Sequence, residues 1–240
     1  MRSIVFRSTD EMIAGAADAF ARRTIDAFST RGSCVIALSG GMTPRPLYRL
    51  LADPDRPWSQ QIPWSGIHVI WSDERCVPPN HEHSNYFAAY QTLLRHVPIP
   101  PANIHRMRGE SPPTEACREY EERLRSLAAL RGDPAHLRVD LVLLGVGRDG
   151  HTASLFPNHP ALAESKLWVS AVNVQAEPPQ RLTLTLPLLN HARHVLFLVA
   201  GREKRDLVTK LRRGDELPAT QVTPHDGEVT WYFDNEATSA

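Results

Sequence analysis

Cysteine, net charge and long apolar runs are all scarce in this chain. Its 240 residues include three cysteines, Cys34, Cys76 and Cys117, and this odd, widely spaced set does not predict a disulfide framework. Such sparse cysteine is typical of a reducing compartment, so we expect a cytoplasmic protein. No apolar run reaches the ~18 residues that a membrane-spanning helix needs. Because the segment from Met1 to Asp10 also lacks an apolar core, the sequence predicts neither a signal peptide nor a membrane partner.

The chain has no surplus of charge of either sign. Its 27 Lys and Arg residues balance 27 Asp and Glu residues, which argues against nonspecific binding to nucleic acid. A local basic pocket for a small molecule is compatible with this balance. The composition is that of a globular protein, and neither repeats nor low-complexity segments occur. We expect one α/β domain over residues 1–240, present as a monomer or a small homo-oligomer.

Several signatures of catalysis are also missing. No Gly-x-Ser-x-Gly elbow provides a serine nucleophile, and no Gly-Lys-Ser/Thr sequence completes a P-loop. Cys76, His81 and His83 lie close in sequence, but no second pair of ligands accompanies them. We interpret that segment as a polar loop. The sequence therefore predicts neither a metal nor another cofactor.

Apolar runs of strand length alternate with segments of helical periodicity. This alternation predicts right-handed crossovers and an open, mostly parallel, Rossmann-like sheet with helices on both faces. A capping box of Ser8 and Glu11 begins the first helix, and Thr43 is the expected N-cap of a helix that begins at Pro44. The expected strands are Ile4–Phe6, Cys34–Leu38, Ile67–Trp71, Ile104–Arg106, Val139–Leu144, Val195–Val199 and Val229–Phe233. The further helices are expected through Ala52 and over Asn85–Leu94, Pro112–Ala129 and Lys204–Leu211.

Polar residues follow four of the expected strands directly. In an open parallel sheet, ligands bind beyond the carboxyl ends of the strands. The convergence of glycines, carboxylates, a histidine and cations at one edge therefore predicts a site there. The segments concerned are Ser39–Thr43, Ser72–Arg75, Gly145–His151 and Ala200–Lys204.

The segment Ser39–Thr43 has the chemistry of an anion cradle. Gly40 and Gly41 allow a ligand close to the backbone, and the following helix begins with unpaired N–H groups. A plain strand-to-helix turn is the alternative interpretation, and the segment alone does not decide between them.

The glycines at 145, 147 and 150 match the dinucleotide fingerprint G-x-G-x-x-G. We interpret this match as false, because Pro157 and Pro160 interrupt the helix that the fingerprint requires. The chemically useful feature is Asp149-Gly150-His151, which places a carboxylate two residues from an imidazole. Histidine transfers protons near neutral pH, and a nearby carboxylate orients its ring.

Several of these segments together resemble the 6-phosphogluconolactonases, from about residue 5 to residue 233. The resemblance implies a fold similar to glucosamine-6-phosphate deaminase. It also implies hydrolysis of 6-phosphoglucono-δ-lactone to 6-phosphogluconate, in the oxidative pentose phosphate pathway, without metal or nucleotide. The segments that carry it are Ser39–Pro44, Trp71–Arg75, Ser84–Tyr86, Gly145–Pro157, Arg181–Thr185, and Gly201 with Lys204.

We expect His151 to deprotonate the attacking water, with Asp149 either orienting the imidazole or binding sugar hydroxyls. The resemblance implies that Arg181 and Lys204 bind the phosphate together with the loop that contains Ser39, Gly40, Gly41 and Thr43. Backbone N–H groups of that loop or Arg75 would stabilise the oxyanion. Asp73 and Asn85 complete the expected substrate-binding set, and Asp73 is either structural or a hydroxyl ligand.

Two other functions remain as alternatives. A glucosamine-6-phosphate deaminase carries Ile-Ala-Phe-Asn-Glu-Pro after its Asp-Gly-His, whereas Thr152–Pro157 here contains no carboxylate for ring opening. A non-catalytic sugar-phosphate sensor usually needs a DNA-binding domain, and the first expected strand at Ile4 leaves little room before it. The sequence favours the lactonase over both.

Overall fold

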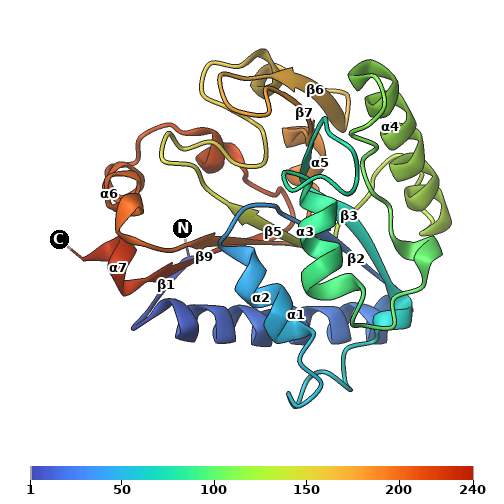
Figure 1. Cartoon of the computed structure of the whole chain (residues 1–240), viewed down its shortest axis with the longest axis horizontal. Coiled ribbons are helices and arrows are strands. Elements are labelled where there is room, and N and C mark those ends of the chain that lie inside the picture. The colour runs from blue at the N-terminus through green and yellow to red at the C-terminus, as the bar shows by residue number, and fades with distance from the viewer. Residues whose placement is uncertain (1, 240) are drawn as a thin grey trace.

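A six-stranded sheet with all neighbouring strands parallel crosses the middle of the molecule (Figure 1). The structure is a computed structural model, and it describes residues 2–239. The strand order is β1-β9-β8-β5-β2-β3, which confirms the predicted mostly parallel sheet. The strands are β1 (Arg2–Phe6), β2 (Cys34–Leu38), β3 (Ile67–Trp71), β5 (Leu141–Gly145), β8 (His194–Val199) and β9 (Glu228–Asp234).

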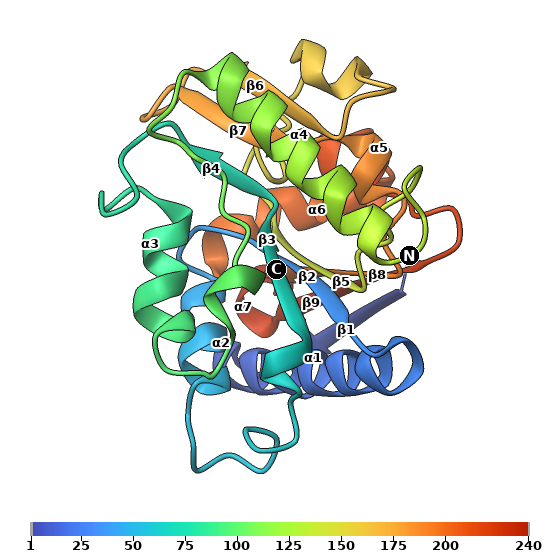
Figure 2. The same ribbon diagram turned by 90° about the vertical axis from the view of Figure 1, so that its right-hand side faces the viewer.

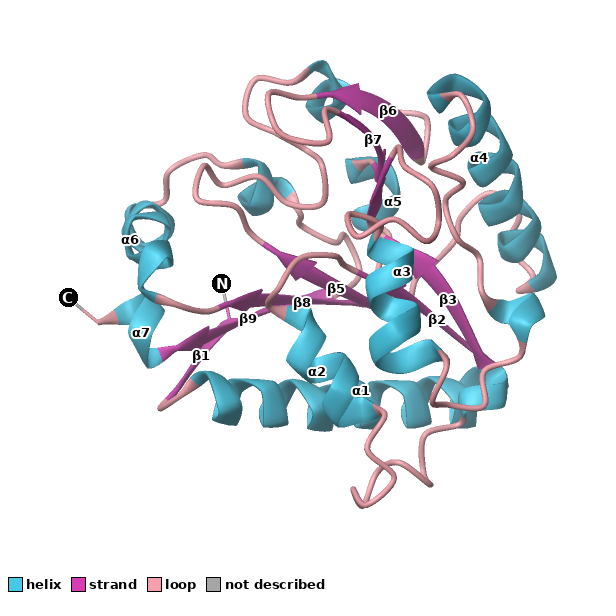
Figure 3. Cartoon of the chain, in the orientation of Figure 1, coloured by secondary structure: helices cyan, strands magenta, loops and turns pink. Residues whose placement is uncertain are grey.

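Helices cover both faces of this sheet, as predicted (Figure 3). On β2, Cys34 and Ile36 pack with the helices of one face, whereas Val35 and Ala37 pack with those of the other. Two-sided burial explains why the strand is an unbroken apolar run. One face carries α1 (Thr9–Arg31), α2 (Pro44–Leu51) and α3 (Asn85–Ala89), and the other carries α4 (Pro113–Leu130), α5 (Leu186–Leu189) and α6 (Arg205–Arg213). The remaining helical segments are α7 (Asn235–Thr238), a π-turn at Tyr90–Leu94, and 3-10 turns at Trp64–Gly66, Pro101–Asn103, Pro160–Ala163, Arg202–Lys204 and Pro218–Gln221.

Two predicted helix starts differ from the structure in detail. The Ser8 hydroxyl caps α1 by accepting from the N–H of Glu11 at 3.2 Å, but the Glu11 carboxylate accepts from Arg7 rather than from Ser8. Thr43 occupies the N-cap position of α2, as expected, but its backbone is already helical and its side chain makes no capping bond. Pro44 is the first residue of α2, as expected. Over residues 2–239, no helix has the length and apolarity required to cross a bilayer.

A second, antiparallel sheet lies beside α4, and the sequence did not predict it (Figure 2). Its order is β4-β7-β6, from β4 (Asp73–Arg75), β7 (Gln180–Leu184) and β6 (Val169–Asn173). The predicted strand at Ile104 reduces to one isolated bridge with Val69. In this small sheet Arg75 pairs with Arg181, and Asp73 pairs with Thr183. Polar residues of the expected site therefore come from strands of the small sheet.

A buried carboxylate stands at the amino end of β5. Asp140, 1% exposed, accepts from the N–H of Val35 at 2.8 Å, from Arg31 at 3.1 Å and from Arg131 at 3.0 Å. The strand that was expected from Val139 begins at Leu141, directly after this residue. Removing one of these partners would leave a buried charge uncompensated and would strongly destabilise the fold.

His68 and His105 stack on each other, and we expect this pair to make the free energy of unfolding decrease at acid pH. His68 Nδ1 lies 3.1 Å from Nε2 of His105, and burial, then the charges of His68 and Arg123, lower the pKa of His105 from 6.5 to about 4. The unfolded chain therefore binds more protons between these values, so unfolding free energy falls as pH drops from about 6.5 towards about 4. Urea unfolding at a series of pH values should show this loss, and His105→Gln should reduce it. An equal loss in the variant would assign the effect to other groups.

Candidate active site

A cleft of about 330 Å³ lies where β2, β5 and β8 end and the small sheet begins. It brings together residues that the sequence predicted from distant segments. The predicted residues that line it are Ser39, Gly40, Gly41, Thr43, Asp73, Arg75, His151, Arg181 and Lys204. Asp149 and Asn85 contact lining residues instead of lining the cleft themselves.

The predicted carboxylate–imidazole pair is formed. Nδ1 of His151 lies 2.6 Å from Oδ1 of Asp149, and the same oxygen accepts from the backbone N–H of His151 at 3.2 Å. The imidazole stacks on Phe156, with ring centroids 4.1 Å apart. A carboxylate at Nδ1 favours the tautomer in which Nε2 is unprotonated, which is the form that accepts a proton from water.

The turn that carries this pair is not a dinucleotide-binding turn. Residues 151–159 contain no helix, and the next helical segment is the short 3-10 turn that begins at Pro160. The Thr152 hydroxyl instead donates to the carbonyl of Gly145 at 2.9 Å, and Ala153 has a φ of 48°. The turn folds back on the end of β5 and holds His151 at the cleft.

The loop between β2 and α2 presents free backbone donors. Within residues 2–239, the N–H groups from Gly40 to Thr43 have no hydrogen-bond acceptor, and Gly41 has a φ of 90°. Tyr48 anchors the start of the loop by bonding to both the N–H and the carbonyl of Ser39. Free N–H groups beside a helix start bind anions, so the cradle is the interpretation that the geometry supports.

Asp73 is held in one orientation by neighbouring side chains. Its Oδ2 accepts from Ser154 Oγ at 2.8 Å, and its Oδ1 accepts from Asn85 Nδ2 at 3.1 Å. Asn85 is 3% exposed and its amide donates to Asp73, so the geometry favours a role in positioning Asp73, and the expected contact with the substrate stays a prediction. A Cβ added to Gly40 would lie 1.8 Å from Oδ1 of Asn85. Asn85 therefore fills the space between the anion loop and Asp73.

Three cations, Arg75, Arg181 and Lys204, line the cleft. The Arg181 Nε donates to the carbonyl of Pro178 at 3.0 Å, and burial, then the charge of Arg75, lower its pKa. The Nε of Arg75 is buried and bonds to no other atom within residues 2–239. Burial is also the main cause of the lowered pKa of Lys204. Each of these cations gains from a bound anion, because the anion replaces lost solvation and offsets the repulsion.

Four residues with clear roles at the site escaped sequence reasoning. Phe156 and Ser154 lie within the motif that carried the resemblance, and Glu203 lines the cleft beside Lys204. Glu74 is 2% exposed and accepts four hydrogen bonds from the segment Arg75–Tyr86, while burial raises its pKa. These roles depend on side-chain contacts that form in the folded chain, which residue spacing alone does not show.

The loop with His81 and His83 is polar in the structure. His81 Nδ1 accepts from the backbone N–H of His83 at 3.1 Å. Over the described part of the chain, no three His, Cys, Asp or Glu side chains are grouped for a metal ion.

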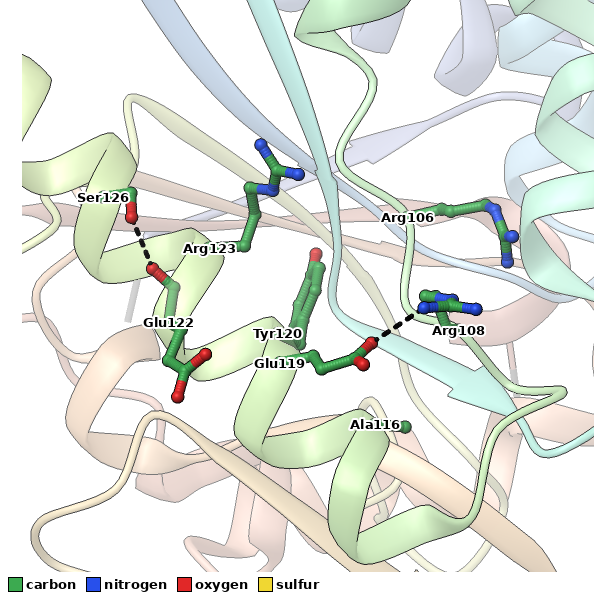
Figure 4. A pocket seen from close by; sticks show the side chains of 8 residues that line it. All are labelled: Arg106, Arg108, Ala116, Glu119, Tyr120, Glu122, Arg123 and Ser126. Carbon is green, nitrogen blue, oxygen red and sulfur yellow. Dashed lines mark hydrogen bonds and ion pairs between the residues drawn. The ribbon is translucent and has the colours of Figure 1, made fainter.

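A second hollow, of about 380 Å³, lies between α4 and the preceding loop (Figure 4). Most of its charges are paired: Arg108 bonds to Glu119 at 3.2 Å, and Arg106 bonds twice to Glu110 at 2.8 and 2.6 Å. Its tyrosine, Tyr120, is buried, and burial raises the pKa of the phenol. The hollow thus presents neutralised charges and a neutral phenol, so we assign the chemistry to the cleft.

Comparison with known proteins agrees with this fold and with the resemblance. The 6-phosphogluconolactonase of Synechocystis sp. is 41% identical over 222 residues, covering 90% of this chain and 88% of the relative. The crystal structure of 6-phosphogluconolactonase from Thermotoga maritima has a TM-score of 0.82 and 28% identity, covering 98% of this chain and 100% of that one. A monomeric glucosamine-6-phosphate deaminase has a TM-score of 0.79 at 22% identity, covering 99% and 98%, and shares the fold.

The family model described as glucosamine-6-phosphate isomerases/6-phosphogluconolactonase matches residues 7–231, which is most of the chain. The chain therefore belongs to the glucosamine-6-phosphate isomerase/6-phosphogluconolactonase family.

Proposed function

We propose that this protein hydrolyses 6-phospho-D-glucono-1,5-lactone to 6-phospho-D-gluconate. The observation that carries the proposal is the Asp149–His151 pair at a cleft that also collects three cations and a loop of free N–H groups. Relatives named as 6-phosphogluconolactonases, one of them 41% identical, support it. So does the absence of a carboxylate from Thr152–Pro157, where a deaminase needs one.

His151 acts as a general base in the proposed mechanism. Its Nε2 takes a proton from water as the water attacks the lactone carbonyl, and the proton then passes to the leaving ring oxygen. Asp149, 2.6 Å from Nδ1, holds the ring and stabilises the imidazolium that forms. The oxyanion is stabilised by backbone N–H groups of Gly40 and Gly41 or by Arg75, both of which line the cleft.

The phosphate lies at the cationic wall in the same proposal. Arg181 and Lys204 bind it together with the loop of Ser39, Gly40, Gly41 and Thr43. An anion there replaces the solvation that both cations lose on burial and offsets the repulsion between Arg181 and Arg75. Asp73 accepts a sugar hydroxyl, since Ser154 and Asn85 hold its carboxylate at the cleft. Asn85 serves as the positioning residue for Asp73.

The cellular setting is proposed from composition. Three free cysteines, one of them buried and two partly buried, fit a reducing cytoplasm. The partner is a small sugar phosphate, and the protein acts as a monomer or a small homo-oligomer.

Substrate specificity tests the proposed function directly. Lactone hydrolysis needs only water activation, whereas deamination also needs ring opening and expulsion of ammonia. We expect purified protein to clear 6-phosphogluconolactone well above its spontaneous rate and to release no ammonia from glucosamine 6-phosphate. A coupled dehydrogenase assay and an ammonia assay measure the two reactions. Ammonia release without acceleration of lactone loss would reverse the assignment.

A further inference from the structure

One hydrogen bond joins the phosphate-binding wall to the turn that carries His151. Lys204, at the end of the 3-10 turn after β8, donates from Nζ to the carbonyl of Val146 at 2.6 Å. Val146 is the first residue after β5, so this contact links two neighbouring strand ends. An ammonium has three N–H donors, and this is the only bond of Lys204 Nζ within residues 2–239. Two donors therefore remain for a ligand.

The carbonyl that Lys204 binds belongs to the same peptide unit as the N–H of Gly147. That N–H donates to the carbonyl of His151 at 2.8 Å. A peptide unit is planar and rigid, so its oxygen and its N–H move together. Lys204 at one end of the unit therefore constrains the backbone of His151 at the other. The hydrogen bonds also polarise one another, which strengthens the link.

The space around this peptide unit is narrow. A Cβ added to Gly147 would lie 2.1 Å from Nδ1 of His151 and 2.6 Å from Oδ1 of Asp149. A small rotation of the unit thus changes the geometry of the catalytic pair directly. Lys204 is only partly buried, so water can compete with the Val146 carbonyl for its ammonium.

We propose that Lys204 is a positioning residue for His151, and that a dianion bound to Lys204 activates the base through the Val146–Gly147 peptide unit. This proposal rests on the proposed lactone hydrolysis. It adds that the phosphate activates the general base as well as binding the substrate to the cleft. An anion fixes the ammonium at the cleft wall, so the carbonyl of Val146 is held throughout the reaction. The energy of phosphate binding, remote from the reacting carbon, is thereby used to position the base that acts there. A dianion in a separate molecule should then activate hydrolysis of a lactone that lacks phosphate.

Unphosphorylated glucono-δ-lactone and phosphite dianion provide the test. In the wild-type protein, phosphite should increase the enzymatic rate on this lactone in a saturable manner, by roughly tenfold or more. Lys204→Met should lower kcat on the same lactone by up to about 10²-fold, the cost of a small misplacement of a catalytic group, and should abolish the response to phosphite. Lys204→Arg retains a hydrogen-bond donor, so it should recover part of the kcat and part of the response to phosphite.

Arg148→Met is the matched control for charge. Arg148 is exposed in the same turn, and its charge contributes to the lowered pKa of Lys204 after burial. Removing it changes the local potential and leaves the bond to Val146 in place, so this variant should respond to phosphite as the wild type does. The imidazole NMR signals of His151 should shift with phosphite in wild type and Arg148→Met, but not in Lys204→Met.

The outcomes separate this proposal from the proposed function. If the phosphorylated lactone is hydrolysed rapidly while phosphite only inhibits or has no effect on the unphosphorylated one, the coupling through Lys204 is overturned and the lactonase remains. Equal loss of phosphite activation in Arg148→Met and Lys204→Met would also overturn it, because charge alone would then explain the effect. No acceleration of either lactone would overturn the proposed function itself.

Discussion

Replacement of His151 by alanine should lower kcat for the lactone by roughly 10²- to 10⁴-fold, the usual contribution of a positioned general base. The imidazole has a carboxylate at 2.6 Å from Nδ1 and a stacked ring at 4.1 Å, so its orientation is set before substrate binds. The variant should remain folded, because the side chain is 29% exposed and fills no part of the core. Single-turnover clearance of fresh lactone, corrected for spontaneous hydrolysis, measures the effect.

Asp149→Asn provides the companion measurement. The amide keeps the size of the side chain but removes the charge that stabilises the imidazolium, so kcat should fall by less than in His151→Ala. Circular dichroism and thermal unfolding establish that both variants are folded. Wild-type turnover in folded His151→Ala would remove this residue from the mechanism.

Gly147→Ala should also abolish most of the activity, although Gly147 carries no functional group. Its new Cβ would lie 2.1 Å from Nδ1 of His151, so the imidazole must move away from Asp149. We expect kcat to fall by about 10²-fold, as a misplacement of about 1 Å produces, with KM changing less. The thermal midpoint should change little, because the displaced side chain is partly exposed and outside the core.

Gly145→Ala is the matched control two residues earlier, at the end of β5. A Cβ there meets no atom within 4 Å, and Gly145 is not among the residues with positive φ. Its kcat should remain close to that of the wild type. Similar losses in both variants would mean that the turn tolerates no methyl group anywhere, and that the clash with His151 is not the cause.

The parallel sheet was predictable because its strands are buried on both faces. Cys34–Leu38 is an unbroken apolar run, and a polar segment follows it where the strand ends. Period and position therefore predicted the strands. The rule that ligands bind at carboxyl ends predicted eight of the nine expected residues that line the cleft, and the resemblance added Arg181. The Asp149–His151 contact followed from two-residue spacing in a glycine-rich turn.

The small antiparallel sheet was not predictable by the same reasoning. Asp73–Arg75 is a strand of three polar residues, and its pairing with Gln180–Leu184 joins segments that are about a hundred residues apart. Asn85 was assigned to the substrate for a related reason. Asn85 bonds to Asp73 and packs against Gly40, and no local sequence pattern indicates either contact.

The two ends of β5 differ in a way that bears on engineering. At its amino end, buried Asp140 and its arginines from α1 and beyond α4 stabilise the sheet, whereas its carboxyl end opens into the turn of the catalytic pair. The side chains of Arg148 and Asp149 are exposed to solvent. Substitutions there leave the core unchanged, so their effects on the free energy of unfolding should be small. Evolution or design can thus alter the turn at one end of the strand while the other end preserves the fold. Libraries restricted to the exposed positions of this turn would retain folded members.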